Sequence, residues 1–404
     1  MRSKLNLQDL SATPNALAPH YAKFQVAERL FLTGHSHQAW PDCGFEGQQE
    51  AWTDAAELVD RKWDRAFAKA EAVRVGYRRL LDDPDADLVL GSNTHELGVR
   101  FLSALPLRER PEIVTTDGEF HSLRRQLDRL TAEGIAVKKV EATPTDTLVE
   151  RLCTILDDRT AAVMVSAVLF RNAHIVPNLG AIQDACLRVG AELFVDAYHA
   201  LNVTTFSIRD EGLQQAFVTG GGYKYCQLGE GNCFLRVPPD CTLTPVVTGW
   251  FAEFERLEKD SGTKGVRYGR GAAAFGGATY DPTSHYRAAR VFEFFHQMRL
   301  TPEFLREVSR HQIHVLVEAF DGLDLDPTVM ARDRDTPMDR IAGFLSLETA
   351  HAKALHDALT SRGVFTDWRD TVLRFGPAPY LSDAQLRDAM AALGEVVAET
   401  PNAL

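Results

Sequence analysis

The stretch "FVTGGGYKYCQLGEGNCFL", residues 217–235, places a lysine between two tyrosines and frames this triplet with glycines. Glycines at residues 220–222 precede Lys224 and allow another group to approach the backbone closely. A lysine in a turn is usually a solvent-exposed side chain, so this stretch alone leaves that interpretation open. It does indicate a tight connection at the end of a short apolar strand.

That strand belongs to a series of short apolar segments separated by amphipathic ones. The segments with strand character are residues 86–92, 112–118, 137–143, 161–170, 192–198 and 216–222. Residues 95–105, 122–134 and 178–190 lie between some of them and carry apolar residues near helical spacing. Parallel strands need such crossover helices, so we predict an α/β fold with a mostly parallel central sheet flanked by helices.

The two ends of the chain have a different pattern. Residues 46–81 are almost entirely compatible with helices, and the region after residue 283 is dominated by helices with short strand candidates at 341–347 and 371–377. We therefore predict a large ligand-binding domain over residues 46–283, a small α+β domain over 284–404, and an N-terminal segment, 1–45, that joins the small lobe. The glycine-rich stretch 265–284 contains three aromatic residues, which favours a functional loop over a linker.

Composition argues against several classes of function. The 404 residues are 45% apolar and 25% charged, which is typical of a globular protein with a large core. A net charge of −12 without a long basic run argues against nucleic acid as a partner. No segment resembles a signal peptide or a bilayer span, so we expect a cytoplasmic protein without a membrane partner. The six cysteines lack both disulfide-scaffold density and metal-binding spacing, so we expect reduced thiols and no metal site.

Polar residues follow several of the predicted strands, where open parallel sheets bind their ligands. In "LGSNTHEL", residues 90–97, Ser92 and Asn93 end a strand and open a helix, whose free backbone N–H groups favour an anion such as phosphate. A simple N-cap explains the same residues equally well. In "TTDGEFHS", residues 115–122, Phe120 and His121 occupy the next strand-to-helix turn, where an aromatic ring either covers something flat or packs under a lobe.

"FVDAYHAL", residues 194–201, is the most informative of these strand ends. Asp196 ends an apolar strand, where a carboxylate is costly unless it meets a cation or a hydrogen-bond donor. His199 follows three residues later and shares the same region if the chain turns. A helix N-cap would explain Asp196 alone, but not its coincidence with Lys224 at the end of the next strand.

These features together predict a pyridoxal phosphate site. A carboxylate keeps the pyridine nitrogen protonated, an aromatic ring covers one face of the cofactor, and a helix start binds the phosphate. A lysine amine forms the Schiff base with the aldehyde and later moves protons. No single one of these features is specific to a pyridoxal phosphate site, but their occurrence together is.

Longer segments resemble a known family. The chain is similar to the class V, fold-type I pyridoxal phosphate enzymes, and among these to the kynureninases. The resemblance runs from "FLTGHSHQAWP" to "VLRFGPAPYLS" and is strongest in "VPNLGAIQDACLRVGAELFVDAYHAL" and "GGGYKY". "TGWF", residues 248–251, resembles the Gly-Trp segment of that family.

The resemblance implies roles for individual residues. Lys224 would carry the cofactor, Asp196 would partner the pyridine nitrogen, and His199 would lie beside the cofactor. The remaining implied cofactor contacts are Tyr223, Ser92 and Asn93 at the phosphate, Phe120 on the ring, and Trp250, which would reach toward a neighbouring subunit's cofactor in a homodimer. Implied substrate contacts are Arg374, for the α-carboxylate, and His35 and Ser36 on the N-terminal side of the pocket.

The substrate side of the pocket departs from the kynureninase pattern. The family's Gly-Asn-Ser-x-Gly is "GHSHQ" here, Glu253 replaces a histidine after the Gly-Trp segment, and Tyr280-Asp281 precedes Pro282 where the family has an Asn-Pro. We predict kynureninase-like hydrolytic cleavage at the β/γ carbon of a kynurenine-like L-α-amino acid.

A class V aminotransferase or a related lyase acting on another amino acid is the alternative. Cysteine desulfurases need a nucleophilic cysteine well after the lysine, and none follows Cys241. A non-catalytic binding module would not need Asp196 and Arg374 together.

Overall fold

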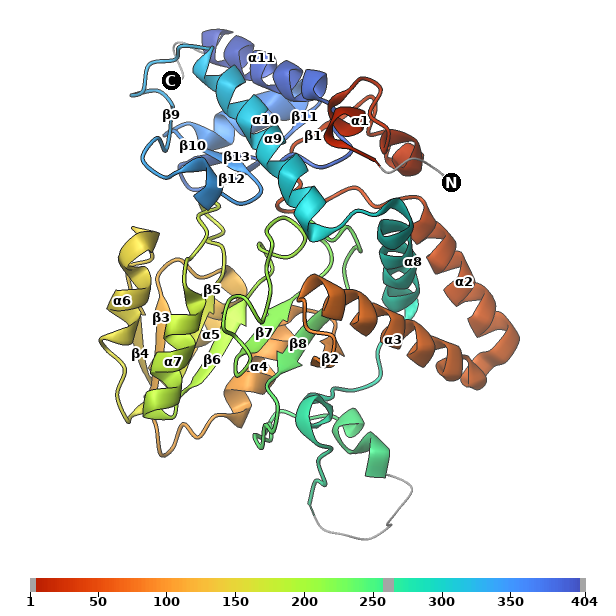
Figure 1. The fold of residues 1–404 in the computed structure, drawn as a ribbon, viewed down its shortest axis with the longest axis vertical. Coiled ribbons are helices and arrows are strands. Elements are labelled where there is room, and N and C mark those ends of the chain that lie inside the picture. The colour runs from red at the N-terminus through yellow and green to blue at the C-terminus, as the bar shows by residue number, and fades with distance from the viewer. Residues whose placement is uncertain (1–4, 257–264, 400–404) are drawn as a thin grey trace.

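The computed structural model describes residues 5–256 and 265–399, and a seven-stranded sheet lies at its centre (Figure 1). Neighbouring strands from β7 to β4 all pair in parallel. The spatial order of the strands is β2 (Asp87–Gly91), β8 (Cys233–Val237), β7 (Phe217–Gly220), β6 (Glu192–Asp196), β5 (Thr160–Ser166), β3 (Glu112–Thr116) and β4 (Ala136–Val140). The predicted mostly parallel sheet is thereby confirmed, as are the six predicted strands.

Strand β8 was not among the predicted strands. It pairs antiparallel with both β7 and β2. The connection from β7 to β8 holds the turn with Lys224 and contains no helix, and a parallel return would have required a crossover helix. Because β2 and β7 are both antiparallel to β8, they run in the same direction. The carboxyl ends of β2, β3, β5, β6 and β7 therefore meet at one edge of the sheet.

Helices cover both faces of this sheet. Along β5, Ala162 and Met164 pack in one apolar cluster, with residues of α4 (Thr94–Ala104) and α5 (His121–Ala132). Val163 and Val165 point the other way, into a cluster that includes residues of α6 (Leu148–Cys153) and α7 (Leu179–Val189). This alternation is the pattern of a strand buried on both faces, so the sheet provides a rigid support for the residues at its edge.

The stretch predicted to be helical, residues 46–81, forms two helices. α2 (Cys43–Leu58) and α3 (Lys62–Leu80) are separated by a 3₁₀ turn, η2 (Val59–Arg61), in which Val59 adopts φ of 55°. Both pack against α8 (Thr283–Met298), and the rings of Tyr77 and Phe292 meet edge-on with centroids 5.2 Å apart. The three helices lie together beside the β2 edge of the sheet (Figure 1).

The C-terminal lobe has its own antiparallel sheet, and the N-terminal segment packs on it (Figure 1). Its strands are β12 (Asp367–Arg369), β13 (Val372–Phe375), β10 (Leu345–Glu348) and β9 (Ala331–Arg332), and its helices are α9 (Pro302–Asp321), α10 (Ala352–Ser361) and α11 (Asp383–Glu399). From the N-terminal segment, β1 (Leu30–Phe31) pairs in parallel with β11 (Val364–Phe365), and helix α1 (Leu7–Ser11) contacts α9. Short 3₁₀ turns complete the fold: η1 (Ala18–Phe24), η3 (Thr145–Thr147), η4 (Trp250–Arg256), η5 (Gly271–Phe275) and η6 (Met338–Arg340).

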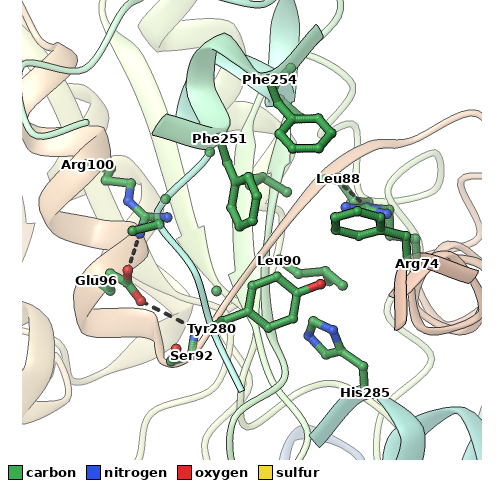
Figure 2. A pocket seen from close by; sticks show the side chains of 18 of the residues that line it. Arg74, Leu88, Leu90, Ser92, Glu96, Arg100, Phe251, Phe254, Tyr280 and His285 are labelled. Atoms are coloured by element: carbon green, nitrogen blue, oxygen red, sulfur yellow. Dashed lines mark hydrogen bonds and ion pairs between the residues drawn. The ribbon is translucent and has the colours of Figure 1, made fainter. Parts of the chain in front are cut away.

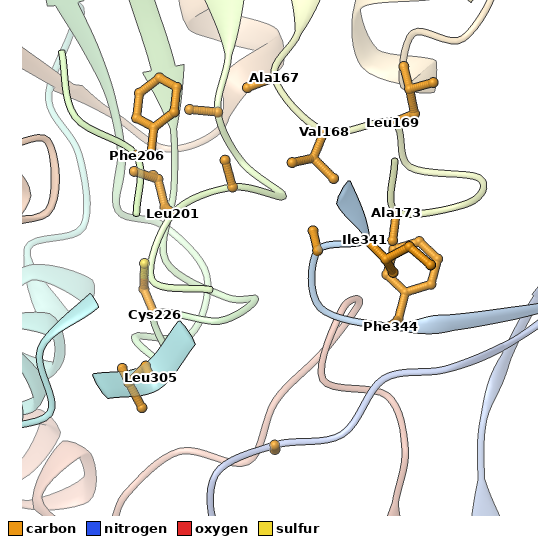
Figure 3. Packing of buried hydrophobic residues seen from close by; sticks show 14 of the residues in the cluster. Ala167, Val168, Leu169, Ala173, Leu201, Phe206, Cys226, Leu305, Ile341 and Phe344 are labelled. Atoms are coloured by element: carbon orange, nitrogen blue, oxygen red, sulfur yellow. The ribbon is translucent and has the colours of Figure 1, made fainter. Parts of the chain in front are cut away.

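The C-terminal lobe meets the large sheet over its carboxyl edge. Figure 3 shows the loop after β5, with Val168 and Ala173, lying close to Ile341 and Phe344 of the lobe. The contact is also made by the backbone, because the Ala342 N–H donates to the Ala173 carbonyl at 2.8 Å. This packing brings β13, which carries Arg374, toward the strand ends that carry Asp196 and Lys224. No helix within the described residues is long and apolar enough to cross a membrane.

Candidate active site

Lys224 is buried at the carboxyl edge of the sheet, with 5% of its surface exposed. Its Nζ lies 5.3 Å from the ring centroid of Phe120, 5.5 Å from that of Tyr198 and 5.0 Å from that of Tyr223. Burial, together with the positive charge of Arg374, lowers the pKa of Lys224 to about 7. The interpretation of a solvent-exposed lysine is therefore wrong, and a large share of this amine is unprotonated and nucleophilic near neutral pH.

The positions before Lys224 must be glycines because neighbouring atoms leave no room for a side chain there. A Cβ on Gly221 would lie 2.5 Å from the Tyr198 hydroxyl oxygen, and a Cβ on Gly222 would lie 2.0 Å from Asn232 Oδ1. Both distances are far below any van der Waals contact. The chain can therefore turn sharply enough to point Lys224 back over the sheet only where side chains are absent.

Asp196 ends β6 and is buried next to this amine. Its Oδ1 accepts the backbone N–H of Tyr198 at 2.9 Å. Burial raises the pKa of Asp196 to about 6, although the hydrogen bond and the charge of Lys224 oppose the rise. A carboxylate held in this way is suited to face a cation.

His199 lies on the turn that follows Asp196 and is also buried. Its ring centroid is 6.3 Å from that of Phe120. Burial, with the charges of Lys224 and Arg374, moves the pKa of His199 well below its ordinary value. The imidazole is therefore neutral at physiological pH and can both donate and accept a hydrogen bond.

One cavity of about 210 Å³ joins nearly all the residues predicted to contact the cofactor. Seven of the eight line it, namely Ser92, Asn93, Phe120, Asp196, His199, Tyr223 and Lys224. The N-terminus of α4 forms part of its wall, because Thr94 and His95 line it too. At that helix start the Asn93 side chain accepts the Glu96 N–H at 2.8 Å, so Asn93 is an N-cap as well as a lining residue.

Trp250 is the predicted cofactor contact that lies elsewhere. It begins η4, is 45% exposed, and donates from its indole Nε1 to Thr279 Oγ1 at 3.2 Å. Its neighbours Phe251 and Phe254 line a larger cavity of about 460 Å³ (Figure 2). This second cavity adjoins the first, because Ser92 and Gly231 line both. Lys224 lines only the smaller one, where the reactive groups are found.

Arg374 lies in the middle of β13 and is buried with 3% of its surface exposed. Its Nη2 donates to Asp367 Oδ2 and its Nη1 donates to the Phe170 carbonyl. The buried Nε has no hydrogen-bond partner among the described residues. Arg374 therefore forms an ion pair with Asp367 that lies in the interior and not on the surface.

His35 lies against the same ion pair, and neither His35 nor Arg374 lines the cavity around Lys224. The Gly34 N–H donates to the Gly376 carbonyl at 2.8 Å, which holds this segment beside β13. His35 Nε2 is 3.5 Å from Asp367 Oδ2, and burial together with Arg374 lowers the pKa of His35 to about 3. The Ser36 N–H donates to the Thr33 carbonyl within a turn, and Ser36 does not line the cavity around Lys224.

Several residues of this site were missed by sequence reasoning. Tyr198 lies between Asp196 and His199, and Glu119 directly precedes Phe120, so both stood inside stretches that had already been singled out. Asp367 and Arg369 come from β12, whose pairing with β13 could not be read from the chain. Asp367 is buried, which favours the neutral acid, but His35 and Arg374 hold its pKa well below the usual value.

Comparison with known proteins agrees with this architecture. Residues 305–393 match the family described as the Kynureninase C-terminal domain. The chain is 23% identical over 384 residues to the uncharacterized aminotransferase YcbU of Bacillus subtilis, covering 92% of this chain and 97% of that protein.

Solved structures share the fold. A mutant of C-DES with glycine covalently linked to its pyridoxal phosphate cofactor superimposes with a TM-score of 0.78 at 16% identity, over 93% of this chain and 98% of that one. The apo cysteine desulfurase of Thermococcus onnurineus gives a TM-score of 0.78 at 16% identity, over 96% and 98% of the two chains. At such identities the likeness concerns the fold, which is fold-type I.

Proposed function

Since the chain is a kynureninase-like, class V pyridoxal phosphate-dependent enzyme, we propose that it hydrolyses a kynurenine-like L-α-amino acid at the β/γ carbon. The observation that carries the proposal is the cavity in which buried Lys224 meets Asp196, close to Arg374. A lysine with a lowered pKa, a buried carboxylate and an arginine are the three groups that an amino-acid enzyme of this class requires.

The residues around the cavity fit the cofactor. Asp196 is a buried carboxylate whose negative charge would be matched by a protonated pyridine nitrogen. Phe120 supplies an apolar ring beside Lys224 Nζ, and the N-terminus of α4 supplies backbone N–H groups and a favourable dipole for the phosphate. When bound, the cofactor supplies an electron-accepting ring that stabilises negative charge at the substrate Cα.

The residues of this chain would then bind the substrate and move protons. Arg374 would hold the α-carboxylate through Nε and its remaining N–H groups, while Asp367 and the Phe170 carbonyl keep the guanidinium fixed. Lys224 Nζ, once released from the cofactor, would accept and return the proton of the substrate Cα, a task that suits a pKa of about 7. Burial of both groups would keep bulk water away from the substrate Cα while its proton is moved.

An aminotransferase is the second candidate, because a relative similar over nearly its full length carries that description. Transamination needs Lys224, Asp196 and Arg374 in the same places. Desulfuration is not favoured, because no cysteine follows Cys241 in the chain. Cys233 does line the cavity, but burial raises the pKa of its thiol to about 12, so it is protonated and weakly nucleophilic at neutral pH.

We further propose a homodimer with its active sites near the interface. The apolar residues Val246, Val247, Trp250 and Phe254 are all at least 44% exposed. They lie in and just before η4, near the glycine-rich stretch 265–284 and the larger cavity of Figure 2. A cluster of exposed apolar side chains like this one is typical of a surface that another chain covers. The six free cysteines are consistent with the cytoplasmic location that we expect.

Spectroscopic titration tests the proposed reaction. Purified protein loaded with pyridoxal phosphate is mixed with candidate amino acids while the cofactor absorbance is recorded and the products are analysed. We expect kynurenine or a close aryl ketone to perturb the absorbance and to release alanine with the aromatic acid. Formation of a 2-oxo acid with retention of the whole side chain would instead favour the aminotransferase. No spectral response to any amino acid would contradict both.

A further inference from the structure

Glu119 is a buried carboxyl group that the reaction proposed above does not use. It is 1% exposed and lies in the connection between β3 and α5. The Thr116 hydroxyl, at the end of β3, donates to Glu119 Oε1 at 2.6 Å, and the Ser166 hydroxyl, at the end of β5, donates to Oε2 at 2.6 Å. Glu119 therefore links the ends of two neighbouring strands at the carboxyl edge of the sheet.

Both links lead to residues that line the cofactor cavity. Ser166 pairs with Asp196 in the β5–β6 register, and the Ala167 N–H donates to the Asp196 carbonyl at 2.9 Å. On the other side, Glu119 directly precedes Phe120, which is the N-cap of α5 but has no side-chain hydrogen bond at that helix end. The position of the Phe120 ring over Lys224 Nζ thus depends on a turn that Glu119 anchors.

The charge of Glu119 is coupled to that of Asp196. Burial raises the pKa of Glu119 to about 7; the Ser166 and Thr116 hydroxyls oppose the rise, and the negative charge of Asp196 adds to it. The groups that bear on Glu119 are thus Thr116 of β3, Ser166 of β5 and Asp196 of β6. Two adjacent buried carboxyl groups do not readily ionise together, so Asp196, which has the lower pKa, ionises first and Glu119 keeps its proton until about neutral pH.

We propose that Glu119 is a positioning residue of the cofactor site, which anchors Phe120 and the end of β5 through two hydroxyls and, below neutral pH, leaves Asp196 as the single charge facing the ring nitrogen. The proposal rests on the proposed placement of the cofactor between Phe120, Asp196 and Lys224. It does not depend on which amino acid is the substrate.

Three variants separate anchoring from charge. Glu119→Ala removes both hydrogen bonds, Ser166→Ala removes one, and Glu119→Gln keeps the shape but cannot ionise. Glu112→Gln is the matched control, because Glu112 is a buried glutamate at the opposite end of β3 and accepts a hydroxyl hydrogen bond from Thr160. Thermal unfolding of each variant verifies that it folds.

Affinity of the apo-protein for pyridoxal phosphate tests the anchor. We expect Glu119→Ala to weaken binding by roughly tenfold and Ser166→Ala by less, because each loses hydrogen bonds that hold the site. Glu119→Gln and Glu112→Gln should bind within about twofold of the wild type. If Glu119→Ala does not fold, Ser166→Ala still tests the hydrogen-bond anchor and Glu119→Gln still tests the charge.

The pH dependence of the bound cofactor's absorbance tests the charge. Above neutral pH the wild type carries a negative charge at Glu119, which stabilises a protonated nitrogen at Lys224 and raises the pH at which that proton is lost. Glu119→Gln lacks this charge, so its midpoint should fall by about half a pH unit while that of Glu112→Gln stays unchanged.

Two results would overturn the proposal. One is wild-type cofactor affinity in the alanine variants together with a wild-type midpoint in Glu119→Gln. The other is a shift of the absorbance midpoint in Glu112→Gln that equals the shift in Glu119→Gln. A protein that binds the cofactor as expected but does not cleave kynurenines would refute the proposed reaction and leave the role of Glu119 standing.

Discussion

Asp196 illustrates how one residue's position determines its chemistry. It is buried at a strand end, it accepts one backbone N–H, and it lies in the same cavity as a buried lysine. We predict that Asp196→Asn retains the cofactor but loses turnover by roughly 100-fold or more, because an amide does not stabilise a protonated ring nitrogen as a carboxylate does. Steady-state kinetics with parallel measurement of bound cofactor checks this, and wild-type turnover would show that Asp196 only caps the turn.

Arg374 is the second residue whose role can be tested alone. We predict that Arg374→Ala weakens amino-acid binding by roughly 30- to 150-fold, corresponding to about 2–3 kcal/mol for a charge-assisted contact in a desolvated site. The cofactor absorbance should not change. Titration with amino-acid substrates measures the loss.

Asp367→Asn is the control for Arg374, because it breaks the same ion pair but keeps the guanidinium. If Arg374 serves only to neutralise Asp367, both variants will lose stability, and neither will change how well the enzyme discriminates between an amino acid and the corresponding decarboxylated amine. If Arg374 binds the α-carboxylate, we expect Arg374→Ala alone to lose that discrimination.

At the scale of elements, the connection from β7 to β8 is the part of the fold most specific to the site. We predict that Gly222→Ala lowers the free energy of unfolding by about 1–3 kcal/mol and reduces cofactor binding, because the new Cβ would overlap Asn232 Oδ1 and Leu228 Cβ. Gly322→Ala is the control, since a Cβ there meets neighbours at 3.4 Å or more and the backbone is not left-handed. Chemical denaturation compares the two, and equal stability would contradict the steric argument.

The sequence predicted elements better than it predicted contacts. Short apolar runs bounded by glycine, such as those ending at Asp196 and Gly220, were sufficient to place six strands and the edge at which their polar residues collect. β8 was missed because an antiparallel return needs no helix and leaves little periodicity in five residues. The pairing of Asp367 with Arg374 depends on how β12 meets β13, which no local pattern specifies. Trp250 lies outside the cavity of its own chain, and its predicted contact with a neighbouring subunit's cofactor stays a prediction.

The whole molecule presents an exposed apolar surface that a single chain leaves uncovered. We predict that the active protein is a dimer and that Phe254→Asp shifts it toward monomers, because a charge would be buried unpaired in the interface. Trp52→Ser is the control, since Trp52 is 81% exposed but belongs to α2. Light scattering at the concentration used for turnover gives the answer, and an active monomer would contradict the proposed interface.

The proposed site and function depend above all on Lys224 as the residue that carries the cofactor. The most direct measurement is reduction of the loaded protein with borohydride, followed by digestion and mass spectrometry of the peptides. We predict a pyridoxyl group on Lys224, and no labelled peptide from Lys224→Ala treated in the same way. Labelling of a different lysine in the wild type, with Lys224 unmodified, would contradict the assignment of the site.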